Sequence, residues 1–130
     1  MKPMKNMDAS SNALDDVSAP THDLKFMMAS NVNVSNFVSV KLSGRSSYDI
    51  WKAQMLCLIK SQALLHIIDA QYPFPEDKGV HMIAQYDQLV KGWIFGSFHE
   101  KLLKNFVDYS GTARKVWMEL ELREAEGTYS

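Results

Sequence analysis

Four histidines and one cysteine are the side chains of this 130-residue chain best suited to metal binding or nucleophilic chemistry. No two histidines share a ligand-like spacing, such as four residues apart with an acid between them. We therefore expect histidines at the surface or at helix ends, and neither a metal nor another cofactor. The histidines are His22, His66, His81 and His99.

The single cysteine, Cys57, has no partner for an internal disulfide and no Cys/His cluster around it for zinc. It lies among Leu56, Leu58 and Ile59, which favours a buried structural thiol, because a reactive thiol needs an accessible, electropositive setting. We find neither a signal-peptide core nor an apolar run long enough to span a membrane. These features predict an intracellular, cytoplasmic protein that does not bind membranes.

Acidic residues offer no recognisable acid/base pair, which would need two carboxylates facing each other across a cleft. Asp15 and Asp16 lie in a polar stretch, and the glutamates of residues 119–126 lie on a terminal helical segment, so both predict solvated surface. No G-x-S-x-G nucleophile elbow occurs, and the glycines are not grouped as in a phosphate-binding loop. We expect a protein that is not an enzyme and has no small-molecule substrate.

The formal net charge of −1 gives no general attraction to nucleic acid. Two loose basic groups are typical of solvated helix faces, and they predict weak, unspecific contacts with RNA or a partner at most. The first group is Lys41, Arg45, Lys52 and Lys60; the second is Lys91, Lys101 and Lys104.

The C-terminal helical segment is acidic, whereas the first helical segment is rich in lysine. This asymmetry has two interpretations: ordinary charge balance within one chain, which we prefer, or a head-to-tail contact between copies. The acidic residues are Glu119, Glu121, Glu124 and Glu126, set against Arg123.

The first part of the chain has no sustained apolar period. Residues 1–34 are rich in Ser, Asn, Asp and Met and predict a flexible arm, with at most a short turn at Lys25–Met28. Alternation of Val38, Val40 and Leu42 then predicts an extended segment laid against the folded domain, because no second strand is available to pair with it.

Apolar residues at helical spacing predict four helices after this segment. The first is expected from Tyr48 to Leu65, with a capping box of Ser46 and Asp49. A loop over Ala70–Gly79 follows, attached to the domain by Tyr72 and Phe74. The inner stripe of the first helix is Trp51, Met55, Leu58 and Ile59.

The second helix is expected from Val80 to Phe95, with Gly96 at its end. The third is expected from Phe98 to Asp108, with a capping box of Ser97 and Glu100, and the fourth from Ala113 to Glu124, capped by Thr112. The residues sharing one face of the second helix are Ile83, Tyr86, Val90, Trp93 and Ile94; the apolar residues of the third are Phe98, Leu102, Leu103, Phe106 and Val107; those at helical spacing in the fourth are Ala113, Val116, Trp117 and Leu120.

These elements predict an all-α protein: a small, antiparallel, four-helix bundle-like domain preceded by a short extended segment and a disordered arm. The expected divisions are the arm at 1–34, the helical domain at 35–126 and a tail at 127–130.

Three blocks of sequence stand out between Val40 and Leu122. Lys41-Leu42-Ser43-Gly44 is followed by Tyr48 and Trp51-Lys52, and further blocks run from Asp87 to Ser97 and from Thr112 to Glu121. In this order they resemble K-L-x-G-x-N-Y-x-x-W-K, D-x-L-x-x-x-W-I-x-x-S and T-A-x-x-x-W-x-x-L-E. These are the motifs of the N-terminal Gag domain of plant Copia-type LTR retrotransposons.

The resemblance implies a non-enzymatic, capsid-forming protein whose copies assemble into a shell around the RNA of the element. The helical periodicity places the three tryptophans in the core, so we expect the motif residues to be structural rather than catalytic. They are Leu42, Gly44, Tyr48, Trp51, Asp87, Leu89, Trp93, Ile94, Ser97, Thr112, Ala113, Trp117 and Leu120.

The sequence contains no CCHC zinc knuckle, protease, integrase or reverse transcriptase motif, so we expect a truncated capsid-like module from an element or from a host gene derived from one. Self-association is the first hypothesis for its function. The second is a host-domesticated adaptor that binds another protein through the bundle surface or the arm, and the third is a non-functional element remnant.

Overall fold

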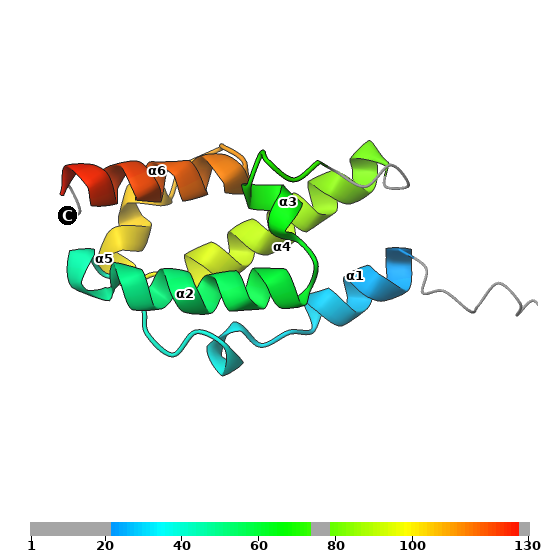
Figure 1. Cartoon of the computed structure of the whole chain (residues 1–130), viewed down its shortest axis with the longest axis horizontal. Helices are drawn as coiled ribbons and strands as arrows, with labels where there is room; N and C mark the ends of the chain where they lie inside the picture. Colours follow the sequence, from blue (N-terminus) through cyan, green and yellow to red (C-terminus); the bar gives the residue numbers. More distant parts are fainter. Residues whose placement is uncertain (1–21, 74–78, 128–130) are drawn as a thin grey trace, which may run out of the picture. The chain divides into compact units, whose positions relative to one another are not determined.

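The computed structural model describes residues 22–73 and 79–127. The chain divides into two compact units, Met1–Asn31 and Val32–Ser130, so the boundary falls slightly before the predicted one. The predicted all-α class is confirmed in the described residues, which contain no β-strand (Figure 1). The α-helices are α1 His22–Ser30, α2 Arg45–Ser61, α3 Leu65–Ile68, α4 Val80–Gly96, α5 Glu100–Leu103 and α6 Ala113–Glu126, with 3-10 helices η2 Val34–Asn36 and η3 Lys104–Phe106.

Helix α1 occupies residues 22–30, where the sequence predicts at most a short turn at Lys25–Met28. Its sequence, HDLKFMMAS, contains neither Gly nor Pro and is rich in Leu, Lys, Met and Ala, which have high helix propensity. The prediction relied on the missing apolar period and gave these intrinsic preferences too little weight. Residues 1–21 lie outside the described part of the chain.

Helix α2 buries the predicted inner stripe of Trp51, Met55, Leu58 and Ile59 completely, as the 3.6-residue period requires. The same period accounts for Cys57, which is exposed rather than buried as predicted. Two residues along a helix is a rotation of about 200°, so a side chain two places from Met55 and from Ile59 lies on the opposite face.

The start of α2 also differs from the prediction. The helix begins at Arg45 after Gly44, and the hydroxyl of Ser47 accepts hydrogen bonds from the backbone N–H groups of Ser43 (2.9 Å) and Gly44 (3.3 Å). The predicted capping box of Ser46 and Asp49 is therefore wrong by two positions, because the N-cap is Gly44 and the N3 residue is Ser47. Ser47 is buried, whereas its neighbour Ser46 is exposed. The Ser47 hydroxyl therefore faces Ser43 and Gly44, just before the helix.

The end of α2 explains why the predicted helix to Leu65 is interrupted. Ala63 has a φ of 58°, and its N–H donates to Lys60 O (3.0 Å) while the N–H of Leu64 donates to Ile59 O (3.0 Å). This pair of bonds is the Schellman motif, in which a left-handed residue, commonly glycine, ends a helix. Leu64 is then buried and starts the turn into α3, a helix that the sequence did not predict.

Helix α4 is confirmed, extending one residue past Phe95 to Gly96, but the third predicted helix is reduced to α5 and η3. The predicted capping box of Ser97 and Glu100 is wrong, because Ser97 terminates α4. His99 caps α5 instead, its Nδ1 accepting from the N–H of Lys101 (3.2 Å). In this segment Phe98, Leu102 and Phe106 are buried, whereas Val107 is exposed.

Helix α6 begins with the predicted cap, in which Thr112 Oγ1 accepts from the N–H of Lys115 (3.2 Å). It runs antiparallel to α2, since Arg45 at the start of α2 faces Glu124 near the end of α6. Figure 1 shows α3 at one end of this pair and α5 at the other. Helix α6 also packs on α3 and α4.

The predicted extended segment is held by two backbone hydrogen bonds. The N–H of Leu42 donates to Ser97 O (2.9 Å), and the N–H of His99 donates to Leu42 O (2.8 Å), forming one isolated parallel bridge. Leu42 is fully buried, as the alternation predicted. In the predicted loop over Ala70–Gly79, Tyr72 is 49% exposed and lines a hollow beside Lys60 and Leu65, while Phe74 lies outside the described residues.

The left-handed alanine gives a stability prediction. Replacing Ala63 by glycine removes the clash of Cβ in this conformation, so Ala63→Gly should raise the free energy of unfolding by about 0.5–1 kcal/mol. The matched control is Ala53→Gly in the exposed interior of α2, which should lower it by about 1 kcal/mol. Urea denaturation followed by circular dichroism measures both. Equal destabilisation by the two glycines would contradict the helix end described here.

Candidate functional site

The indole of Trp51 is where the three sequence blocks meet. It is fully buried, and its ring centroid lies 5.5 Å from that of Trp117 and 6.1 Å from that of Phe98. Its Nε1–H donates to Ser97 Oγ (2.7 Å), and that hydroxyl donates to Ile94 O (2.8 Å). Trp51 of the first block is thereby joined to Ser97 at the end of the second block and to Trp117 in the middle of the third.

A second polar connection joins α4 to the start of α6. Asp87 Oδ1 accepts from the N–H of Ala113 (3.0 Å), placing a carboxylate at a helix N-terminus, where it is electrostatically favoured. Lys91 Nζ donates to Gly111 O (2.6 Å) from a residue that is only 9% exposed. Lys91, which sequence reasoning grouped with surface lysines, therefore holds the connection between α5 and α6.

Most of the motif residues are buried in the helical domain. Gly44, Asp87 and Leu89 are partly buried, and Thr112 is exposed, acting as the cap of α6. The buried motif residues are Leu42, Tyr48, Trp51, Trp93, Ile94, Ser97, Ala113, Trp117 and Leu120.

The histidines have different environments. His81 is exposed beside Gln85 and His99 caps a helix, while His66 is buried within the four-residue helix α3, so all three lie at the surface or at a helix end as predicted. The carbonyl of His66 accepts from Arg114 Nη2 (3.1 Å). Within residues 22–73 and 79–127, no three His, Cys, Asp or Glu side chains are grouped as metal ligands would be.

The first basic group is largely engaged within the chain. Lys41 Nζ donates to Gly96 O (2.8 Å), Arg45 lies 3.7 Å from Glu124, and Lys52 lies 3.6 Å from Glu121. Lys60 remains exposed on α2. The two ion pairs join α2 to α6, so the opposite charges of these helices balance each other in one molecule.

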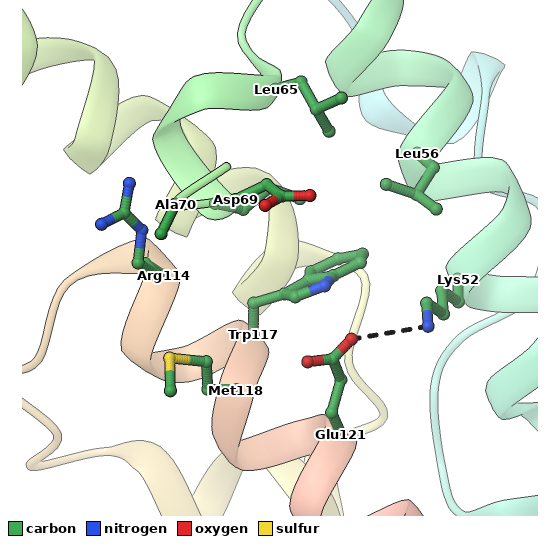
Figure 2. Close-up of a pocket in the computed structure, with 10 residues that line it drawn as sticks. Lys52, Leu56, Leu65, Asp69, Ala70, Arg114, Trp117, Met118 and Glu121 are labelled. Atoms are coloured by element: carbon green, nitrogen blue, oxygen red, sulfur yellow. Dashed lines mark ion pairs between the residues drawn. The ribbon is translucent and has the colours of Figure 1, made fainter. Parts of the chain in front are cut away.

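A pocket of about 400 Å³ lies between α2, α3 and α6. Figure 2 shows the Trp117 indole within it, with the Lys52–Glu121 pair on one side and Arg114 on the other. Two bases and two acids thus line the pocket together with apolar side chains. This mixed rim favours an apolar side chain over a polyanion such as RNA. The lining residues are Lys52, Leu56, Leu65, Ile68, Asp69, Ala70, Arg114, Trp117, Met118 and Glu121.

The outward face of α6 carries the candidate functional site. Met118 and Leu122 are 57% and 51% exposed, one helical turn apart, while the inner face of the same helix is buried. A second hollow of about 530 Å³ lies along this face, and Met118 borders both hollows. Sequence reasoning missed these two residues, although they depart from the polar pattern expected on an outer face. The second hollow is lined by Tyr109, Lys115, Met118, Glu119, Glu121 and Leu122.

Comparison of the chain with models of protein families, with curated proteins and with solved structures finds no match. Among the helices of the described residues, none combines the length and apolar character needed to cross a lipid bilayer.

The hydrogen bond of Trp51 gives a second stability prediction. Ser97→Ala leaves the buried indole N–H without its acceptor and should lower the free energy of unfolding by about 1–3 kcal/mol. Trp51→Phe in the Ser97→Ala background should cost less than in the parent, because the N–H is then already unpaired. Denaturant melts of the four proteins measure this coupling. If the two substitutions lowered the free energy of unfolding by strictly additive amounts, the hydrogen bond between Trp51 and Ser97 would be contradicted. Ser39→Ala, at an exposed serine, serves as the control.

Tyr48 gives a prediction on pH. Burial, together with repulsion from Glu121, Glu124 and Asp49, raises the pKa of its hydroxyl from 10.0 to about 12. The folded-state pKa lies above the unfolded value. The contribution of the protonated Tyr48 hydroxyl to the free energy of unfolding is therefore complete below pH 10 and is lost as the pH rises to 12. Tyr48→Phe should therefore lose less stability than the parent between pH 10 and 12, by about 2 kcal/mol.

Urea melts at pH 9, 10.5 and 11.5 measure this difference, and the exposed Tyr72→Phe serves as control. Parallel loss of stability in the parent and Tyr48→Phe would show that the Tyr48 hydroxyl is not selectively protected from ionisation.

Proposed function

We propose that this chain is a non-enzymatic protein-association module whose bundle-like helical domain binds other copies of itself, as its resemblance to a Copia-type Gag domain implies. The outward face of α6 carries the proposal. Val116, Trp117 and Leu120 anchor one side of this helix in the core, while Met118 and Leu122 present apolar surface on the other. A fixed helix with an exposed apolar pair and a hollow beside it is suited to receive a partner surface.

The contact is apolar rather than a head-to-tail attraction between oppositely charged ends. Lys52 and Arg45 of α2 already face Glu121 and Glu124 of α6, and Glu119 is paired with Arg123 (2.9 Å). These intramolecular pairs support the interpretation of internal charge balance. Association through Met118 and Leu122 should therefore persist in about 0.5 M salt, which screens exposed charges.

The expected association is weak. Helix α6 has 14 residues and is therefore about 21 Å long. A contact limited to one face of such a helix falls below the roughly 1,000 Å² typical of stable interfaces. We expect dissociation constants in the micromolar range or weaker, so that many copies are needed for a large assembly.

The second candidate is a host-domesticated adaptor that binds a different protein. Met27 and Met28 favour it, because both are more than half exposed on α1, in the first compact unit. Exposed methionines are adaptable contacts at binding surfaces. A full-length chain that remains monomeric would favour this adaptor over self-association.

Light scattering after size exclusion tests the proposal at about 5 and 200 µM, a range that spans weak association constants. The parent should gain mass with concentration, whereas Met118→Ser and Leu122→Ser should each weaken association about ten-fold by replacing apolar contact area with a hydroxyl. Ile50→Ser is the matched control, because Ile50 is equally exposed on α2. A parent that stays monomeric at both concentrations would refute self-association.

A further inference from the structure

Four residues of α6 form one stripe along its outward side: Lys115, Met118, Leu122 and Glu126. Their spacings of 3, 4 and 4 return to the same side of an α-helix, since 11 residues make about three turns. The two apolar residues are in the middle, and one charge of each sign is at either end. All four side chains are exposed.

The two end charges differ from the other charged residues of the helix. Glu119, Glu121 and Glu124 each have an ion-pair partner within the chain. Among the described residues, no ion pair is formed by Lys115 or Glu126. These side chains therefore remain available at the two ends of the apolar pair.

Both end charges are also unfavourable for their own helix. A helix carries partial positive charge at its N-terminus and partial negative charge at its C-terminus, so a lysine in the first turn and a glutamate in the last are each at the disfavoured end. Exchanging the two signs would stabilise α6 by itself. Both charges would instead be favourable beside a neighbouring helix that runs in the opposite direction. Lys115 would then lie near the negative end of that helix, and Glu126 near its positive end.

We propose that α6 packs antiparallel against α6 of a second copy across a two-fold axis, an inference that rests on the proposed self-association and specifies its geometry. Lys115 of each copy faces Glu126 of the other, and Met118 of each packs against Leu122 of the other. Each lysine then lies near the negative end of the opposite helix, and each glutamate near the positive end. A two-fold interface of this kind is self-complementary.

A parallel pair would place lysine against lysine and glutamate against glutamate, and would therefore be disfavoured. The hollow of about 530 Å³ adjoins the stripe, since Lys115, Met118 and Leu122 are among its lining residues. It provides space for the apolar side chains of the opposite helix.

Charge reversal tests the geometry in the full chain, at about 30 mM salt so that screening does not hide the effect. Lys115→Glu and Glu126→Lys should each weaken self-association about ten-fold, because two attractions per dimer become repulsions. An equimolar mixture of the two variants should associate more tightly than either variant alone, since every facing pair is then opposite in sign. The double variant should likewise recover part of the lost affinity.

The folded state is protected in these variants, because each single reversal improves the charge at its own helix end. Circular dichroism melts verify this, and Lys101→Glu on α5 controls for the change in net charge. If the parent associates and the single reversals associate with the same affinity, the antiparallel geometry is overturned and self-association stands. A parent that never associates overturns both.

Discussion

The hydrogen bond from the buried indole of Trp51 to Ser97 is the interaction on which the rest of the domain depends. It fixes α2 against the end of α4, and the same turn accepts the N–H of Leu42, so the extended segment is held at that point too. Trp117 of α6 also packs against this indole, with the ring centroids 5.5 Å apart, which helps to position α6. A buried N–H without an acceptor is costly, which favours this single arrangement of the three helices.

Much of the core could be predicted, because burial of one helical face imposes a 3.6-residue period that is visible in the sequence. Trp51, Met55, Leu58 and Ile59 follow from that period alone. The function of Ser97 did not follow, because a serine three residues before a glutamate has the spacing of a capping box whether or not the helix begins there. Ala63 gave no signal at all, since an alanine rarely adopts the left-handed conformation that it has here, next to the buried Leu64.

The candidate site was harder to predict than the core for a related reason. Sequence reasoning counted charges on α2 and α6 and left open whether they act within one chain or between chains. The antiparallel arrangement of the two helices pairs Lys52 with Glu121 and Arg45 with Glu124, which uses those charges internally. What remains on the outside of α6 is an apolar pair flanked by Lys115 and Glu126. That remainder is visible only once the inner face and the internal ion pairs are known.

The most direct test is a dilution series followed by two-dimensional ¹H–¹⁵N NMR of the full chain, from about 20 to 500 µM, across the range of weak association. We predict concentration-dependent shifts at the amides of Lys115, Met118, Leu122 and Glu126, with the indole N–H signal of buried Trp51 unchanged. Spectra that do not depend on concentration, or shifts confined to residues away from α6, would contradict this prediction.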